Sequence, residues 1–240
     1  MSPYHDYIFV PLYNGLIYLI DVFPWMDAGI AVIVFTIIVK LILFPISKKA
    51  IRTQVGMKEI EPELARLRAT YKDDKQVQTL KTMELYKEKG INPFSSFFLL
   101  FIQLPILYAL YSVFMRSGLP VVNASLLYSF VKIPTISMHF LGLFDISKPN
   151  IFFALLAALS QFLQLHYSLA SKAPSSPASS GDAAVEVAQN MTKQMKYIFP
   201  VMVFFISFKL SAVISVYWIV SNLFTLGQEL YVRSRLAVKA

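Results

Sequence analysis

The sequence predicts an all-α, polytopic membrane protein with five transmembrane helices, an outer interfacial helix and a cytoplasmic helical hairpin. The composition is the first observation: 56% of the residues are hydrophobic, 15% are charged, and the mean hydropathy is +0.57. Ordinary soluble domains carry more charge and fewer apolar residues. Second, apolar segments approach the roughly 20 residues that a helix needs to cross a bilayer. Third, Lys and Arg gather in alternate connecting segments, which is typical of multi-pass proteins.

These patterns divide the chain into segments. In chain order we expect an outer interfacial amphipathic helix at 1–27, a first span at 28–47, a cytoplasmic helical hairpin at 48–92, a second span at 93–115, an outer loop at 116–149, a third span at 150–170, a flexible cytoplasmic loop at 171–194, a fourth and fifth span within 195–231, and a cytoplasmic tail at 232–240.

The basic residues predict the orientation, because Lys and Arg near span ends stay on the cytoplasmic side. Seventeen of the 22 lie in 48–92, in 171–196 or after 232, and four lie in the segments expected outside. The N-terminus is therefore expected outside and the C-terminus in the cytoplasm. The net charge of +8 is then mainly a consequence of topology. A nucleic-acid role needs a basic, water-exposed face with stacking aromatics, so we expect no DNA partner.

The segment before the first span resembles a helix that lies in the outer membrane interface. Pro11 suits its first turn. Asn14, Tyr18 and Asp21 recur at helical spacing. Apolar residues occupy another face: Leu12, Leu16, Leu19 and Phe23. An ordinary loop with polar flanks is the alternative.

The segment 48–92 predicts two antiparallel helices joined at 72–74. The first has apolar residues three and four positions apart: Met57, Ile60, Leu64, Leu67 and Tyr71. Asp73 or Asp74 can cap the second, and Gly90 can end it. Eleven basic and seven acidic residues favour an anionic lipid surface or ribosomal RNA. The candidate contact residues are Pro62, Arg66, Arg68 and Lys72. A charged hairpin that only marks the inner side is the alternative.

The two longest remaining loops differ in composition. The outer loop 116–149 is largely apolar and is expected to pack at the interface as a lid over the outer side. The inner loop that begins at 171 is rich in Ser, Ala and Pro and is expected to be flexible.

Polar residues recur inside the predicted spans at similar depth. The last span carries six of them at alternating spacings of four and three: Ser211, Ser215, Trp218, Asn222, Thr225 and Glu229. The third span carries Gln161, Gln164 and Ser168 on one face, and the second carries Gln103. A polar stripe that faces lipid is costly. The stripes therefore predict either a hydrated cavity or hydrogen bonds between helices.

Lys40 is the charge within the first span, about six residues or ~9 Å from its inner end. Its long side chain has two destinations: the inner surface, by snorkelling, or a water-filled groove open to the cytoplasm. Helical Cα–Cβ bonds tilt toward the N-terminus, which here means outward, and this favours the groove. A pairing with Glu229, near the inner edge of the last span, is a third interpretation.

The motifs together resemble the YidC/Oxa/Alb family of membrane protein insertases over almost the whole chain. The matching stretches are TIIVKLILFPISKKAI, IEPELARLRATYKDD, LYKEKGINPF, FIQLPILYALYSVF, FLGLFDISKPN, FPVMVFF and VYWIVSNLFTLGQE. The resemblance implies five spans around a hydrophilic groove that is open to cytoplasm and lipid and closed outside. It also implies a short form, without a large outer domain.

The resemblance further implies which residues meet substrates. Lys40 occupies the position where most bacterial members carry Arg, so this chain keeps the charge but not the planar fork. The implied substrate contacts are Thr36, Gln103, Leu104, Leu107, Tyr217 and Trp218. The start of the last span, FKLSAVISVYW, departs from a Pro-Ala-Gly or Pro-Ser-Gly start, so its outer end is expected to differ.

The predicted function is insertion and folding of nascent membrane proteins, with Lys40 receiving polar or acidic tails. We expect no enzyme, no cofactor and no metal site, because nucleotide and zinc motifs are missing and the three histidines are scattered. The expected partners are nascent membrane proteins and the lipid bilayer, with the ribosome and a Sec-type translocon as candidates. The expected location is a bacterial plasma membrane. The alternatives are a small transporter or channel with Lys40 in its pathway, or a passive assembly chaperone.

Overall fold

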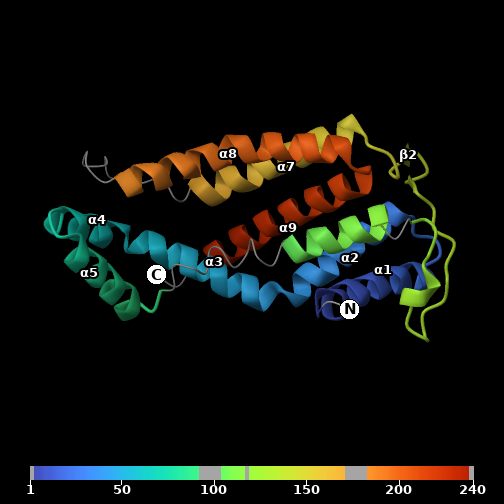
Figure 1. Ribbon diagram of the computed structural model, residues 1–240, viewed down its shortest axis with the longest axis horizontal. Coiled ribbons are helices and arrows are strands. Elements are labelled where there is room, and N and C mark those ends of the chain that lie inside the picture. The colour runs from blue at the N-terminus through green and yellow to red at the C-terminus, as the bar shows by residue number, and fades with distance from the viewer. Residues whose placement is uncertain (1–2, 92–103, 117–118, 171–182, 238–240) are drawn as a thin grey trace.

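Helices form most of the structure, a computed structural model that describes residues 3–91, 104–116, 119–170 and 183–237. Long helices run side by side along the molecule (Figure 1). A helical hairpin extends from one end, and the N-terminal helix and an irregular segment lie at the other end (Figure 1). The strands are confined to one two-stranded hairpin within the described residues.

The chain starts with a π-helical turn, η1 (His5–Phe9), that continues into α1 (Val10–Val22), with Pro11 in the first turn as expected. Only part of the expected face pattern is correct. Leu16 is buried and Tyr18 is exposed, but Asn14 is buried as well. Its amide donates to Leu126 O at 2.8 Å and its carbonyl accepts from Tyr128 N at 2.7 Å. Asn14 therefore binds residues 119–149, which are predicted to lie outside and are called the outer segment below, rather than facing water.

The first predicted span bends before its expected end. Helix α2 (Ala28–Ile42) begins at Asp27, whose side chain caps Ile30 N at 2.9 Å. Helix α3 (Phe44–Glu59) follows after one residue at an angle of 65°. Pro45 explains the bend, because it lacks an N–H and its ring crowds the carbonyl four residues earlier. Residues 44–47 thus belong to the helix that leads toward the hairpin.

The hairpin turns where the sequence predicts, at 72–74, but its predicted first helix is interrupted at Ile60. It consists of α4 (Glu61–Thr70) and α5 (Lys75–Glu88). Asp74 caps α5 by accepting from Gln76 N and Val77 N, and Gly90 ends it with a φ of 63°. A small core of its own holds the two helices together: Ile60, Leu64 and Leu85.

The middle of the chain contains the apolar helix Leu104–Phe114, which runs into a π-helical turn, η2 (Ser112–Arg116). The outer segment follows, with a 3₁₀ turn, η3 (Ala124–Leu126), and a hairpin of β1 (His139–Phe140) and β2 (Phe144–Asp145). The segment packs on α1 and on the start of α2: Asn123 N donates to Tyr13 Oη and Ala28 N to Ser137 O, each at 2.8 Å.

Three long helices complete the fold: α7 (Ile151–Ala170), α8 (Ala183–Lys209) and α9 (Ala212–Ala237). Helix α8 starts inside the range predicted as a flexible loop, so that prediction is wrong for 183–194. The Ser- and Pro-rich part of that loop ends at residue 180, and the residues from Ala183 favour a helix. The remainder of the predicted loop, 171–182, lies outside the described residues. Helix α9 also continues to Ala237, into the predicted tail.

Only some of the described helices are long and apolar enough to cross a membrane. Among the described residues, α7 alone is a single helix that is long and apolar enough to cross a membrane, over Ile151–Ser168. The bent pair α2 and α3 meets the same criterion if it is counted as one broken span, and Leu104–Phe114 is apolar but shorter. Five spans therefore stay a prediction.

Candidate functional site

Lys40 joins α2 to α9 in the interior of the helical body. Its Nζ donates a hydrogen bond to Thr225 Oγ1 at 3.1 Å, and Thr225 Oγ1 donates to Ser221 O of its own helix at 2.8 Å. The lysine is partly buried, and it has a polar partner on the neighbouring helix. The contact holds the Lys40 side chain on the face of α2 that is turned toward α9.

Both partners lie at the same depth. Lys40 is twelve residues after the start of α2, and Thr225 is thirteen residues after the start of α9. The two helices begin at the same end of the molecule (Figure 1). At 1.5 Å per residue each is ~18–20 Å from that end, well inside a layer with the ~30 Å thickness of a hydrocarbon core.

A second polar group joins α7 to α9 beside this contact. Trp218 Nε1 donates to Gln161 Oε1 at 3.0 Å, and Gln161 Nε2 donates to Gln164 Oε1 at 3.2 Å. One turn further, Asn222 Nδ2 donates to Ser160 Oγ at 3.1 Å. Gln161, Trp218 and Asn222 are buried. These polar side chains bind one another, so for them the structure favours hydrogen bonds between helices over a hydrated cavity.

The other predicted contact residues differ in their accessibility. Thr36 is buried, and its hydroxyl donates to Val32 O at 2.6 Å. Tyr217 is buried as well, whereas Leu104 is 51% exposed and Leu107 is partly buried against the core. Gln103 lies outside the described residues.

The polar stripe of α9 is buried except at Thr225, which is partly buried. Ser211 Oγ donates to Ile146 O at 2.6 Å just before α9 begins, and Glu229 toward the other end of α9 forms an ion pair with Arg233, one turn further along. Ser211, Ser215 and Glu229 are all buried. The stripe therefore faces the other helices, which is the arrangement that a lipid environment favours.

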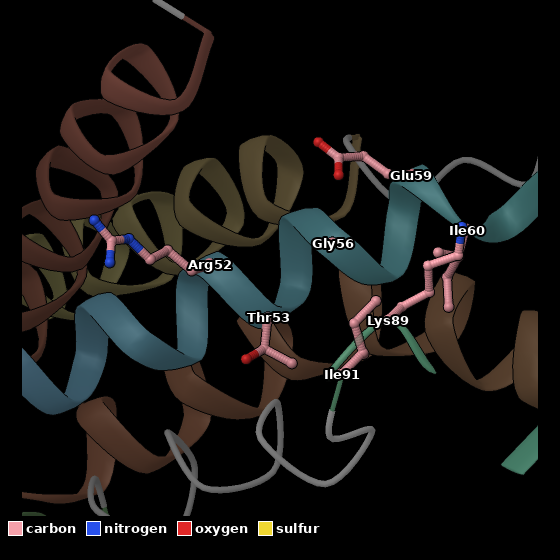
Figure 2. A pocket seen from close by; sticks show the side chains of 8 residues that line it. Arg52, Thr53, Gly56, Glu59, Ile60, Lys89 and Ile91 are labelled. Atoms are coloured by element: carbon pink, nitrogen blue, oxygen red, sulfur yellow. The ribbon is translucent and has the colours of Figure 1, made fainter. Parts of the chain in front are cut away.

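The hairpin residues lie apart from this group. Pro62, Arg66, Arg68 and Lys72 are all exposed. At the base of the hairpin, a pocket of about 290 Å³ lies between α3 and the end of α5, and Figure 2 shows its lining residues, Thr53, Gly56, Ile60 and Ile91 among them. Arg52 and Glu59 also border this pocket, but Figure 2 shows their charged groups directed away from Ile91. The pocket is shallow and mixed in polarity.

The sequence analysis did not identify two of the hydrogen-bond partners in this site. Thr225 was placed on the buried stripe but not opposite Lys40, and Ser160 was not singled out. Thr225 lies three residues after Asn222, and Ser160 directly precedes Gln161. Spacing identifies such positions as belonging to a buried face, but it does not pair residues from different helices. Among the described residues, no three His, Asp or Glu side chains are grouped so that they could hold a metal ion.

Comparisons with known proteins identify the class. The family model described as 60Kd inner membrane protein matches residues 20–239. The chain is 35% identical to a membrane protein insertase YidC of Clostridium tetani over 209 residues, which cover 86% of this chain and 82% of that protein. It is 30% identical to a membrane protein insertase YidC of Fusobacterium nucleatum over 210 residues, 86% of each chain. It is 26% identical to a Bacillus anthracis protein, membrane protein insertase YidC 2, over 231 residues, 94% of this chain and 79% of that one.

The fold and these matches define a helical membrane protein that acts on other membrane proteins. The chain belongs to the YidC/Oxa family of membrane protein insertases. It is accordingly an insertase and not an enzyme, its substrates are nascent membrane proteins, and it is a multi-pass protein of a bacterial cell membrane. The family assignment confirms the resemblance found in the sequence and favours insertion over the transporter or channel alternative.

Proposed function

We propose that the chain inserts membrane proteins through a polar groove that opens to the cytoplasm and to lipid, with Lys40 receiving the polar or acidic tail of the substrate. Five spans would form the body: α2, the helix that includes Leu104–Phe114, α7, α8 and α9. The N-terminus would lie outside and the hairpin, the loop before α8 and the C-terminus in the cytoplasm. The distribution of basic residues supports this orientation.

One observation carries the proposal: Lys40 is held by Thr225 about 18 Å along the bundle rather than at its end. A substrate tail must cross hydrocarbon at a cost of several kcal/mol for each polar group without a partner. A cation and a hydroxyl at this depth offer partners partway across, so the dry part of the path becomes shorter. The tail would replace Thr225 as an acceptor of a hydrogen bond from Lys40 Nζ.

The apolar part of the substrate needs a separate path, and the half-exposed Leu104 and partly buried Leu107 are its best candidates. Partition into lipid would then drive release. Tyr217 and Trp218 would form the wall behind this path, since both are buried. Direct contact with Trp218 would require its hydrogen bond to Gln161 to open.

The hairpin would meet the cytoplasmic partners. Its exposed Arg66, Arg68 and Lys72 favour an anionic partner, either lipid headgroups or ribosomal RNA. A Sec-type translocon is a further candidate partner. Release from a translating ribosome would place a nascent chain beside the groove.

Reconstitution tests the proposal. Liposomes that contain the purified protein should insert a single-span substrate with a short outer tail, measured by protection of the tail from protease. They should pass no ions, measured with a potential-sensitive dye. Insertion no faster than in protein-free liposomes would contradict the proposal, and ion flux without insertion would indicate a channel.

Photo-crosslinking tests the path. A crosslinker at Leu104 should capture an arrested nascent chain, whereas the same probe at Leu159 should not, because Leu159 lies on α7, away from the proposed path. The two positions are matched, since both side chains are half exposed. Equal capture at both positions would contradict a defined path.

A further inference from the structure

The tip of the β1–β2 hairpin exposes apolar side chains at the outer end of the molecule. Leu141 is 60% exposed and Leu143 is 77% exposed, and Phe144 beside them is exposed as well. Single exposed leucines are normal on protein surfaces, but a contiguous apolar group marks a contact with a membrane or a partner.

The backbone of this tip is fixed and unusual. Leu141 and Gly142 both have a positive φ, 53° and 71°, and Leu143 N donates to Phe140 O at 3.0 Å. Two successive positive φ angles are typical of a type I′ turn, where Asn, Asp or Gly is favoured at the first position. A leucine is disfavoured there, because its Cβ crowds the backbone at a positive φ. The turn itself therefore does not explain the leucine.

The base of the hairpin is held firmly against the body. Leu141 N donates to Asp27 Oδ2 at 2.9 Å, at the start of α2. Phe140 lies so close to Gly29 that a Cβ on that glycine would be 2.3 Å from the Phe140 ring. The tip therefore projects from a fixed base, and its leucines do not fold back onto the protein.

The exposed tip continues the apolar surface of α7. The ring of Phe144 stacks on that of Phe152, with centroids 6.4 Å apart and planes at 11°. Phe152 begins a row of exposed apolar residues along α7 that includes Leu155 and Leu159. Only 33% of the spanning window of α7 is buried. The surface that α7 turns toward lipid therefore extends directly onto the hairpin.

Polar groups border the tip on its other side. Asp145 forms an ion pair with Lys148 at 3.1 Å and accepts from Ser147 N at 3.0 Å. The hydrogen bond from the Ser147 hydroxyl, and to a smaller extent that from Lys148, lowers the pKa of Asp145 to about 2. Apolar residues with a charged rim are the pattern of segments that sit at the membrane interface.

We propose that Leu141, Leu143 and Phe144 form an anchor that inserts into the lipid leaflet at the start of α7, between the headgroups and the upper acyl chains. The occupant of this surface is bilayer lipid. The inference rests on α7 being a membrane span, as in the proposed topology, but not on the role of Lys40. The anchor would fix the outer segment, and through Asp27 the start of α2, at a constant depth in the membrane.

Depth-dependent quenching tests the anchor. The chain contains no cysteine, so Leu143→Cys can carry a single NBD fluorophore, with Lys148→Cys as the control. The Lys148 side chain is 78% exposed in the charged rim. In liposomes, the probe at 143 should emit at shorter wavelength than the probe at 148. It should also be quenched by lipids with a nitroxide near the headgroup and be protected from aqueous iodide.

Two results would overturn the proposal. Iodide quenching at 143 equal to that at 148 would place the tip in water. Protection from both iodide and nitroxide lipids would mean that protein covers it. Failure of insertion in the same liposomes would leave the quenching result unchanged, so the proposed function and the anchor fail separately.

A second variant tests the role of Leu141. Leu141→Asn suits a positive φ better than leucine, so the turn should stay folded. Loss of an apolar anchor residue should nonetheless reduce lipid quenching of the probe at 143. Unchanged quenching in Leu141→Asn would overturn the part assigned to Leu141.

Discussion

The hydrogen bond from Lys40 to Thr225 bears on the interpretations of a charge inside the first span. A snorkelling lysine would extend toward the inner end of α2, but this one meets a residue of α9 at its own depth. Glu229, the pairing candidate, forms an ion pair with Arg233. The geometry is that of a cation held within the bundle, and it supports the proposal that Lys40 receives polar substrate groups.

Substitutions at Lys40 separate electrostatic capture from anchoring. Lys40→Arg should retain insertion, whereas Lys40→Ala should lose mainly substrates whose outer tail carries Asp or Glu. Lys40→Glu should be the most harmful, because like-charge repulsion in a region of low effective dielectric reaches several kcal/mol. The measurement is insertion of two substrates that differ only in tail charge, at equal levels of each variant. Equal losses for both tails would contradict capture by charge.

A double-mutant cycle tests the contact itself. Thr225→Val removes the acceptor and keeps the shape, so it should lower the free energy of unfolding by about 1.5–3 kcal/mol, the range for hydrogen bonds to charged groups. The loss should be much smaller when Lys40 is already Ala. Thr225→Ser, which keeps the hydroxyl, is the control. Additive effects of Lys40→Ala and Thr225→Val in detergent unfolding would show that the two residues do not interact.

Part of this site could be predicted from residue spacing. The alternation of three and four residues in α9 identified its buried stripe, and the structure buries Ser211, Ser215, Trp218, Asn222 and Glu229. The partners were beyond reach, because periodicity describes one helix at a time. The bonds from Trp218 to Gln161 and from Asn222 to Ser160 depend on how α7 and α9 pack.

At the scale of the elements, the hairpin is held together by its own core, so it can be altered without disturbing the body. Leu64→Ala should destabilise the hairpin by about 2–5 kcal/mol, because Leu64 is buried in that core. Leu80→Ala on the same hairpin should change its stability by no more than about 0.5 kcal/mol, because Leu80 is exposed.

The two variants also report on function. Insertion should fall in Leu64→Ala and stay normal in Leu80→Ala, while hydrogen exchange in α7 and α9 stays unchanged in both. Normal insertion with a loosened hairpin would favour the interpretation that the hairpin only marks the cytoplasmic side.

Asn14 connects α1 to the outer segment, and its replacement should release that segment. Asn14→Ala leaves Leu126 O and Tyr128 N without their partner, so a loss of about 1–3 kcal/mol is expected. Proteolysis of the outer segment in detergent should accelerate. Asp21→Ala is the control, because its bond to Lys132 N is long, at 3.4 Å, and exposed. Equal protease sensitivity in both variants would contradict a specific role for Asn14.

Element types were predictable where local chemistry decides them. Asp74 and Gly90 marked the ends of α5, and Pro11 the start of α1. Element ends were missed where composition changes gradually. The Ser- and Pro-rich stretch obscured the start of α8 at Ala183, and the apolar run 35–46 concealed the bend caused by Pro45. The burial of Asn14 could not be foreseen either, since its partners lie more than 100 residues away.

At the scale of the whole molecule, charge and apolar surface are arranged along one axis. The basic hairpin lies at one end, and the apolar outer segment with α1 lies at the other (Figure 1). Lys40 and Thr225 lie between them. A molecule with this arrangement has a preferred orientation in a bilayer, because basic residues are retained on the cytoplasmic side and apolar loops can enter the opposite interface.

Cysteine labelling tests that orientation in intact cells, since the chain has no cysteine of its own. A cysteine at Lys148, in the exposed rim of the outer segment, should react with an impermeant maleimide from outside. One at Thr79, exposed on α5, should react only after the membrane is opened. The reason is the distribution of charge: eleven basic residues in 48–92 would have to cross the membrane for the opposite orientation. Labelling at Thr79 from outside, with Lys148 protected, would reverse the topology and remove the cytoplasmic opening on which the proposed groove depends.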